Sequence, residues 1–175
     1  MSFTANSKGV GYEPGYFLAH EECTRETREF AQDSALVATT DYGAKYVPMG
    51  TAYPTNDGNA IGITYEDVDV TNGNVPGSVV TKGEVYENRL AITDVSYNAV
   101  SPVGTENPSE EGWYEKNTSN EYVLTTDTEV DDQKTYYAQT VTRLASAAKS
   151  ALAALGFTFK TEATVTRPNF GKGVV

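Results

Sequence analysis

The chain of 175 residues is long enough for one principal domain carrying an insertion, but not for two large domains. Its 12 tyrosines, 15 glycines and 7 prolines indicate a turn-rich β protein rather than a helical bundle. The formal net charge of −11 argues against nucleic acid and membrane surfaces as partners, because both require clustered Lys and Arg. Cys23 is the only cysteine, which excludes an intrachain disulfide and a cysteine-based zinc site. No apolar run resembles a secretion signal or a membrane span, so we expect synthesis in a reducing cytoplasm.

Residues 1–33 are predicted to form an extended arm followed by a ribbon. The arm, residues 1–15, is polar and punctuated by glycine, and its apolar residues have no regular period. The apolar residues of the arm and of the start of the ribbon are Phe3, Val10, Tyr12, Tyr16 and Phe17. Two interpretations stay open for the arm: a frayed terminus, or a segment that orders on a partner by adding a strand. The mixed charges of Glu21–Phe30 favour an extended ribbon over a helix.

The stretch 50–86 is predicted to be the centre of a β-rich body, because it combines tight turns with short apolar runs. Its turn and scaffold residues are Asn56, Asp57, Gly58, Ala60 and Gly62. The turn at 56–58 includes a residue that is free to take a positive φ, and Ala60 and Gly62 leave little room for bulk in the next strand. We therefore expect Gly58 and Gly62 to be needed for the fold and for close packing. Further strands or apolar segments are expected at 34–39, 45–50, 78–81, 84–86 and 95–100.

Residues 102–138 are predicted to be an inserted acidic β module, which assigns 34–101 and 139–161 to the body. Its aromatic residues fall in three short runs separated by polar turns, a pattern typical of a three-stranded meander with an aromatic face. Trp113, Tyr114 and Tyr122 are candidates for an outward-facing binding surface. Aromatic rings on so small a sheet more often form its own core.

Residues 140–155 have the clearest helical pattern in the chain. Apolar residues recur there at spacings of three and four, and Gly156 is placed to end the helix. The alanine-rich side of this helix allows close approach to a sheet or to a neighbouring subunit. Residues 157–161 alternate in polarity as a strand does, and residues 162–175 are assigned to a C-terminal tail.

Residue types that carry chemistry are sparse. His20 is the only histidine and has no second histidine to complete a metal or catalytic site, so it is interpreted as a surface residue beside an acidic run. Glu66, Asp67 and Asp69 match a calcium loop only in part and are interpreted as an acidic edge near a turn. The sequence therefore predicts no catalytic residue, no metal site and no cofactor.

Residues 45–86 contain, in order, a strand, the segment NDGNAIGI, a polar stretch and the segment that begins VVTKGEVY. This order resembles the head decoration proteins of tailed phages of the lambda type. The alanine-rich helix and following strand within 144–159 are similar to the C-terminal helix and strand of that family. The segment from GWYEK to TYY is similar to small β modules inserted into phage structural proteins. The chain departs from the family in its longer N-terminal region, its insertion and its tail after Lys160.

The resemblance implies a non-enzymatic viral structural protein with a compact β-barrel or tulip-like body and one helix. It implies a homotrimer on the outer surface of a bacteriophage virion, where the trimer stabilises the expanded capsid at three-fold positions. The residues implied to bind the major capsid protein, by adding a strand, are Phe3, Val10, Tyr12, Tyr16 and Phe17. The acidic module is expected to point away from the shell.

Two alternatives remain. Another virion component, such as a tail or tail-tube protein, would share the β body but form rings or tubes. A carbohydrate-binding module would stack Trp113, Tyr114 and Tyr122 on a glycan, and this is the weaker alternative.

Overall fold

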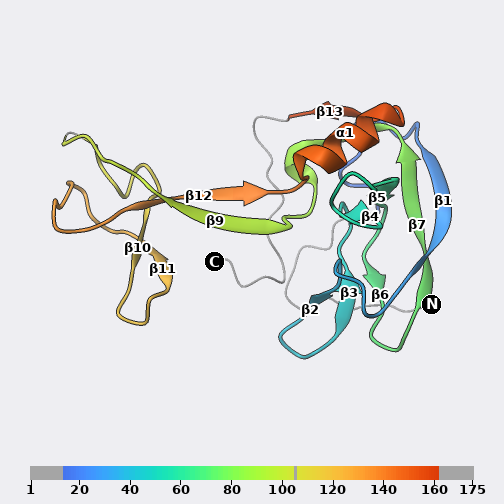
Figure 1. Cartoon of the computed structure of the whole chain (residues 1–175), viewed down its shortest axis with the longest axis horizontal. Coiled ribbons are helices and arrows are strands. Elements are labelled where there is room, and N and C mark those ends of the chain that lie inside the picture. Colours follow the sequence, from blue (N-terminus) through green and yellow to red (C-terminus); the bar gives the residue numbers. More distant parts are fainter. Residues whose placement is uncertain (1–13, 105, 162–175) are drawn as a thin grey trace. The chain divides into compact units, whose positions relative to one another are not determined.

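The computed structural model describes residues 14–104 and 106–161 (Figure 1). The protein is mainly β, with 35% of its residues in strands and 8% helical, and its described residues include one α-helix. The fold class predicted from the sequence is thus confirmed. The arm residues Phe3, Val10 and Tyr12, and the tail at 162–175, lie outside the described residues.

The chain divides into two compact units. The first, called the body, comprises Met1–Thr93 and Arg143–Val175, and the second, called the module, comprises Asp94–Thr142. The predicted insertion at 102–138 lies within the module. The module also takes in 94–101 and 139–142, which the sequence pattern assigned to the body, because these two stretches form strands that pair with each other.

The strands of the body are short and form three sheets. Their bounds are β1 Thr24–Phe30, β2 Ala38–Thr39, β3 Lys45–Val47, β4 Ala52–Tyr53, β5 Gly62–Thr64, β6 Val68–Asp69, β7 Val75–Lys82, β8 Glu84–Tyr86 and β13 Thr158–Lys160. One sheet has the order β1-β7-β5-β4 and another the order β2-β3-β6, both antiparallel, while β13 pairs with β8 in parallel. A 3₁₀ turn at Glu87–Arg89 follows β8.

The sheets of the body are open. The part of the chain that the structure describes contains no closed barrel, so the predicted barrel-like body is not found there. One reason lies at β4, which is two residues long and is followed directly by Pro54. Proline has no backbone N–H with which to continue a ladder of hydrogen bonds, so the sheet ends on that side.

The central strand of the body is β7, because core residues lie on both of its faces. Val79 and Val80 are both fully buried, and adjacent side chains on a strand point to opposite faces. The core cluster on the Val80 side consists of Phe17, Met49, Ala52, Ala60, Ile63, Val80, Val85, Leu90, Leu144, Ala148, Leu152 and Phe157. The cluster on the Val79 side consists of Phe30, Val47, Val68, Val70 and Val79. Burial on both faces explains why the sequence has an unbroken apolar pair here instead of an alternation.

The ribbon predicted at Glu21–Phe30 is confirmed as extended chain, but it belongs to the body and not to a separate arm. Residues Thr24–Phe30 form β1, which pairs with β7 along its whole length. Only Phe30 of this strand is buried. The strand predicted at 34–39 shortens to Ala38–Thr39, whereas the one predicted at 84–86 matches β8.

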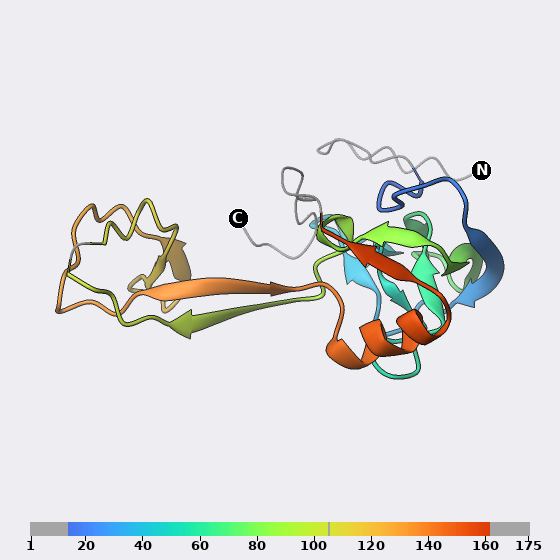
Figure 2. The same cartoon turned by 90° about the horizontal axis from the view of Figure 1, so that it is seen from above.

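The single described helix, α1, runs from Ser146 to Ala154 and packs Ala148 and Leu152 into the core. The predicted start at 140 is wrong, because Thr140–Thr142 belong to a strand of the module. The predicted end is confirmed: Gly156 has a φ of +97°, and its N–H donates to the Ala153 carbonyl at 3.0 Å. Figure 2 shows α1 leading into β13, which lies beside it.

The module is a four-stranded antiparallel sheet. Its strands are β9 Asp94–Ala99, β10 Tyr114–Lys116, β11 Tyr122–Leu124 and β12 Tyr137–Thr142, in the order β11-β10-β12-β9. The predicted meander of three strands corresponds to β10, β11 and β12. The fourth strand, β9, pairs with β12 over six residues and is the stretch that sequence reasoning placed in the body.

Gly58 and Gly62 differ in what surrounds them. A Cβ atom at Gly62 would collide with the Val79 side chain and the Val80 carbonyl oxygen, whereas a Cβ at Gly58 would meet nothing within 4 Å. Gly58 does not use its freedom to take a positive φ. The turn is fixed instead by the Asp57 carboxylate, which accepts from the Asn59 backbone N–H at 2.7 Å. Close packing is therefore a property of Gly62 and not of Gly58.

We predict that Gly62→Ala lowers the free energy of unfolding of the body by about 1–3 kcal/mol, because β5 cannot move away from β7 without breaking their pairing. The matched variant Gly58→Ala should change it by less than about 0.5 kcal/mol. Urea unfolding followed by circular dichroism measures both values. Equal effects of the two substitutions would contradict this account of Gly62.

Candidate functional site

The first described residues run along the free side of β8. The Tyr86 N–H donates to the Phe17 carbonyl at 2.8 Å, and the Ala19 N–H donates to the Glu84 carbonyl at 2.9 Å. An isolated antiparallel bridge joins Leu18 to Val85. The strand β8 is thus held between this segment and β13.

Tyr16 and Phe17, both predicted to contact the capsid, occupy different environments. Phe17 is fully buried in the core of the body. The Phe17 side chain is therefore inaccessible to a partner, and we remove Phe17 from the candidate binding residues. Tyr16 is half-buried, and its ring lies 4.7 Å from the Arg89 guanidinium, measured from the ring centroid.

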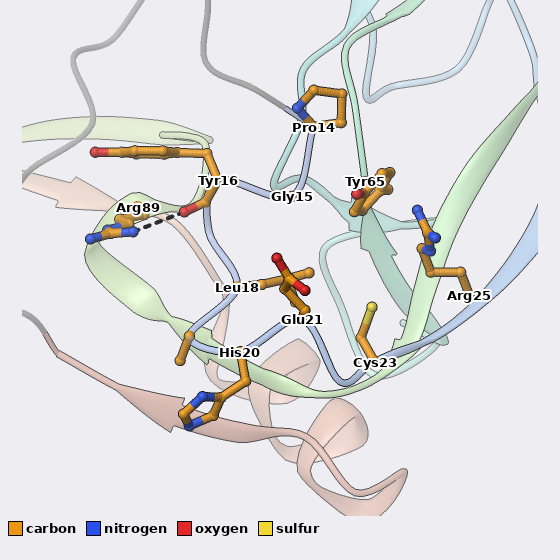
Figure 3. A pocket seen from close by; sticks show the side chains of 11 residues that line it. Pro14, Gly15, Tyr16, Leu18, His20, Glu21, Cys23, Arg25, Tyr65 and Arg89 are labelled. Carbon is orange, nitrogen blue, oxygen red and sulfur yellow. Dashed lines mark hydrogen bonds between the residues drawn. The ribbon is translucent and has the colours of Figure 1, made fainter.

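A depression of about 840 Å³ lies where this first segment meets the body. Its lining residues are Pro14, Gly15, Tyr16, Leu18, Ala19, His20, Glu21, Cys23, Arg25, Tyr65 and Arg89. Figure 3 shows Tyr16 with Arg89 on one side, Tyr65 with Arg25 on the other, and Leu18 between them. Leu18, Cys23 and Tyr65, which supply apolar surface to this lining, are half-buried.

Two arginines stand at opposite sides of the depression, each against a tyrosine ring. The Arg25 guanidinium lies 4.3 Å from the centroid of Tyr65. Arg89 lies 4.6 Å from the centroid of Tyr86 and donates from Nη1 to the Tyr16 carbonyl at 3.1 Å. Stacking of this kind holds the Arg25 guanidinium in place while its N–H edge can still bind a carboxylate. The depression can therefore take an extended peptide with apolar side chains and an acidic group.

The histidine at one end of the depression is already engaged. His20 Nε2 lies 2.7 Å from a carboxylate oxygen of Glu84, which also contacts Lys160 Nζ at 2.9 Å. The pKa of Glu84 is lowered, chiefly by the hydrogen bond from Lys160 and further by His20. His20 is largely exposed, as the sequence predicted, but its partner is Glu84 on β8 rather than its acidic neighbours in sequence.

The described residues contain no group of three or more His, Cys, Asp and Glu side chains that could hold a metal ion. Of the carboxylates weighed as a calcium loop, Asp67 accepts from the Met49 backbone N–H at 2.6 Å. Asp69 accepts from the Thr71 backbone N–H at 2.9 Å. Both therefore fix the backbone around turns, which agrees with their interpretation as an edge near a turn.

Asn56 was predicted only as a turn residue. In the structure it forms hydrogen bonds at both points where the chain passes between the body and the inserted sequence. Its Nδ2 donates to Thr93 Oγ1 at 3.0 Å and to the Arg143 carbonyl at 3.3 Å. Its Oδ1 accepts from the Ala145 N–H at 3.0 Å, at the N-cap of α1. Thr93 Oγ1 donates to the Arg143 carbonyl at 3.2 Å. We call this cluster the latch. It holds together the two ends of the insertion, at Thr93 and Arg143, and it binds the backbone at the N-cap of α1.

The other scaffold residues have separate roles. Ala60 lies in the core, and Asp57 accepts hydrogen bonds from Asn59 and Thr55. These two hydrogen bonds lower the pKa of Asp57, and the bond from the Asn59 backbone has the larger effect. Sequence reasoning found this turn from its residue types. It could not find the latch, because the partners of Asn56 lie 37 to 89 positions away in the chain.

The aromatic residues of the module pack on one another. Tyr122 stacks on Tyr97 with ring centroids 4.0 Å apart and an interplanar angle of 6°, and Tyr114 meets Tyr97 edge-on at 5.1 Å. Tyr122 lies on β11 and Tyr97 on β9, the two edges of the sheet. Neighbouring strands lie about 4.8 Å apart, so such a contact across two intervening strands requires a strongly curled sheet. The tyrosines fill the concave side of that sheet.

Trp113 and Tyr136 form a second aromatic contact in the module, with centroids 5.9 Å apart. Trp113, Tyr114 and Tyr122 were predicted as an outward-facing surface. Each of the three rings contacts another aromatic ring of the module. Tyr97 was not a candidate from the sequence. The available signal was the apolar segment at 95–100, in which it alternates with polar residues.

A charged network holds the module beside the fully buried ring of Tyr136. The Tyr136 hydroxyl donates to Asp127 Oδ2 at 2.7 Å. Lys134 Nζ contacts Asp127 at 2.8 Å and Glu115 at 3.0 Å. The bond from Lys134, followed by that from Tyr136, lowers the pKa of Asp127, and the same carboxylates raise the pKa of Lys134.

Comparison of the chain with protein-family models, with curated proteins and with solved structures returned no match. Within the described residues, no helix has both the length and the apolar character that crossing a membrane requires.

We predict that Asn56→Ala lowers the free energy of unfolding of the body by about 1–3 kcal/mol, because it leaves partly buried groups of the latch without hydrogen bonds. Asn72→Ala is the matched control, since Asn72 is exposed, and it should be close to neutral. Thermal unfolding of both variants tests this. A neutral Asn56→Ala would show that the latch does not stabilise the body.

We predict that the module loses stability as the pH falls below about 4. The pKa of Asp127 in the folded protein is below its ordinary value of 3.8. Ionised Asp127 therefore stabilises the module above that pH, and the contribution is lost as the pH falls through the folded pKa. Trp113, the only tryptophan, reports on the module by fluorescence. Asp127→Asn should destabilise the module at neutral pH and flatten this pH dependence, and an unchanged acid transition in that variant would refute the assignment.

Proposed function

We propose that this chain is a non-enzymatic decoration protein that binds the outer surface of a bacteriophage capsid and stabilises the expanded shell. The observation that carries the proposal is the anchoring of Pro14–Ala19 on β8 by backbone hydrogen bonds. The chain is therefore attached to the β body at a fixed point directly after residue 13. A strand-adding arm requires such an anchor, because force or binding energy at the arm must reach the body through it.

The elements that carry the resemblance to lambda-type decoration proteins belong to one unit, which supports the same proposal. Residues 45–86 supply β3 to β8, and α1 and β13 complete this body. The parts named in the resemblance are thus physically joined: β8 pairs with β13, and α1 shares a core with β5 and β7. The major capsid protein is the proposed partner, through an added strand.

A homotrimer is the proposed working form. Each arm supplies one modest contact, and a symmetric trimer engages three copies of the same site on the shell at once. Joining the three contacts raises the overall affinity far above that of one arm. A lattice under internal pressure is stabilised by clamps of this kind, which bridge neighbouring capsid subunits.

The charge of the module supports an outer position. Asp94–Thr142 contains ten Asp and Glu residues and two Lys residues, a formal charge of −8. Such a surface is repelled by the phosphates of packaged nucleic acid. We therefore propose that the module points away from the shell.

We predict that removing residues 1–13 weakens binding to expanded capsids at least about 100-fold while the unfolding temperature changes little, because no described core residue is lost. Capsids lacking the protein are mixed with the full or shortened chain and sedimented. Electron microscopy of the particles then locates the bound protein, with density on the tail favouring the tail or tail-tube alternative. Undiminished binding of the shortened chain would overturn the arm mechanism.

Two controls separate binding from folding. Phe17→Ala should lower the free energy of unfolding by about 3–5 kcal/mol, because Phe17 lies in the core. A chain whose residues 95–141 are replaced by a short glycine-rich turn should keep its affinity for the capsid. Loss of binding in that second variant would place the capsid contact in the module and contradict its outward position.

A further inference from the structure

We propose that the open edge of β1 pairs with the β1 strand of a second copy of this chain, antiparallel and about a two-fold axis at Thr27. The strand β1 ends the sheet β1-β7-β5-β4 and lies on the outer side of β7 (Figure 1). Six of its seven residues, Thr24–Glu29, are exposed. The inference concerns contact between copies and does not rest on capsid binding.

The backbone of Thr27 points away from β7. Ser78 lies opposite Thr27 on β7, and its carbonyl accepts from the N–H of Tyr65, which follows β5, at 2.9 Å. Ser78 therefore directs its backbone groups toward the β5 side, and the Thr27–Ser78 pair is not hydrogen-bonded. Bonded and non-bonded pairs alternate along an antiparallel ladder. Arg25 and Glu29, two positions to either side, consequently also direct their N–H and C=O groups to the open edge.

These outward backbone groups can receive another strand. In the ranges that the structure describes, no segment other than β7 forms backbone hydrogen bonds with Arg25, Thr27 or Glu29. The Glu29 carbonyl accepts from the Tyr53 hydroxyl at 2.9 Å, and a carbonyl oxygen has a second lone pair with which to accept another bond. An edge of this kind is a template for strand addition.

The order of charges along β1 is complementary to itself. When Thr27 lies opposite Thr27 of the second copy, Arg25 faces Glu29 and Glu26 faces Arg28, and symmetry repeats each pair. Opposite charges that face each other across two strands stabilise their pairing, whereas like charges destabilise it. The two-fold axis must pass through a residue whose backbone groups point outward. Centring the pair on Arg25 or on Glu29 would put like charges opposite each other, so a single register is selected.

Interactions within one copy are compatible with this contact. Glu26 and Arg28 form an ion pair on one face of β1. The same pair from the second copy would lie alongside it in the opposite order, so that the four charges alternate in sign. The body carries a formal charge of −3, which is the −11 of the chain less the −8 of the module, so repulsion between two bodies is weak.

The contact is closed, and it joins two copies only. Each copy has one β1 edge, and the two-fold pairing uses the same edge in both copies. The other edge of the sheet, β4, is two residues long and is followed by Pro54, so the sheet does not continue there. Charges on an open edge exclude strands of unmatched sequence, and the charge order of β1 makes its own copy the matched strand.

Charge reversal tests the pairing. Glu26→Lys with Glu29→Lys makes all charges on β1 positive, and Arg25→Glu with Arg28→Glu makes them all negative. Each variant alone should self-associate at least about tenfold more weakly than the unaltered chain in sedimentation equilibrium. An equimolar mixture of the two variants should associate again, because opposite charges then face each other. A mixture that stays apart, or an unaltered chain that does not associate at about 1 mM, would overturn the proposal.

A matched control separates the pairing from net charge. Glu110→Lys with Glu111→Lys adds the same positive charge at exposed positions of the module and should not weaken association. Equal weakening in this control would overturn the proposal by assigning the effect to net charge. Circular dichroism checks that every variant is folded.

A disulfide at the two-fold axis tests the register. Residues opposite each other in a bonded antiparallel pair have Cα atoms about 5.5 Å apart, within the range of a disulfide. Thr27→Cys with Cys23→Ser should therefore give a covalent dimer on mild oxidation. Thr24→Cys with Cys23→Ser is the control, because in this register position 24 lies about 20 Å from its counterpart. Equal yields of dimer from the two variants, or no dimer from Thr27→Cys, would overturn the register.

Discussion

The body depends on the burial of both faces of β7. A strand with one solvent-exposed face can alternate polar and apolar residues. In β7, however, Val79 and Val80 are buried in two different core clusters, one on each face. This requirement extends to the neighbouring strands, since β5 must approach closely enough for Gly62 to lie against Val79 and Val80. It also determines the place of β1, which pairs with the other side of β7 and contributes Phe30 to the second core. The open edge of β1 consequently carries charged residues, which discourage pairing with unrelated chains.

The latch around Asn56 shows how an insertion can be tolerated in such a small core. The chain leaves the body at Thr93 and returns at Arg143, and hydrogen bonds among Asn56, Thr93 and Arg143 close the gap between these two points. The Arg143 guanidinium is buried and donates to the Leu90 carbonyl. The Arg143 guanidinium thus has a hydrogen-bond partner at this junction, as its burial requires. The hydrogen bonds of the latch hold the two ends of the insertion together on the body side of the junction.

Local sequence signals predicted part of this structure and missed the rest for physical reasons. Turn chemistry and apolar periodicity located β8, the strands of the aromatic runs, the end of α1 at Gly156 and the mainly β class. They misplaced the start of α1, because Val141 fits a helical spacing as well as it fits a strand. Whether Phe17 belonged to an arm or to a core depended on a pairing with β8, nearly 70 residues away, and no local pattern encodes that. The depression is likewise assembled from residues that lie far apart in sequence, between Pro14 and Arg89.

The uneven distribution of charge has a consequence for how densely copies of this protein can be arranged. The module has a formal charge of −8, whereas the whole chain has −11, so the body contributes little of the total. Copies bound side by side on one surface bring equally charged modules together. Their repulsion decays over about 8 Å at physiological ionic strength and over about 30 Å at 0.01 M salt. Ionic strength thus sets a minimum spacing between neighbours, and a crowded lattice of this protein is a high-salt arrangement.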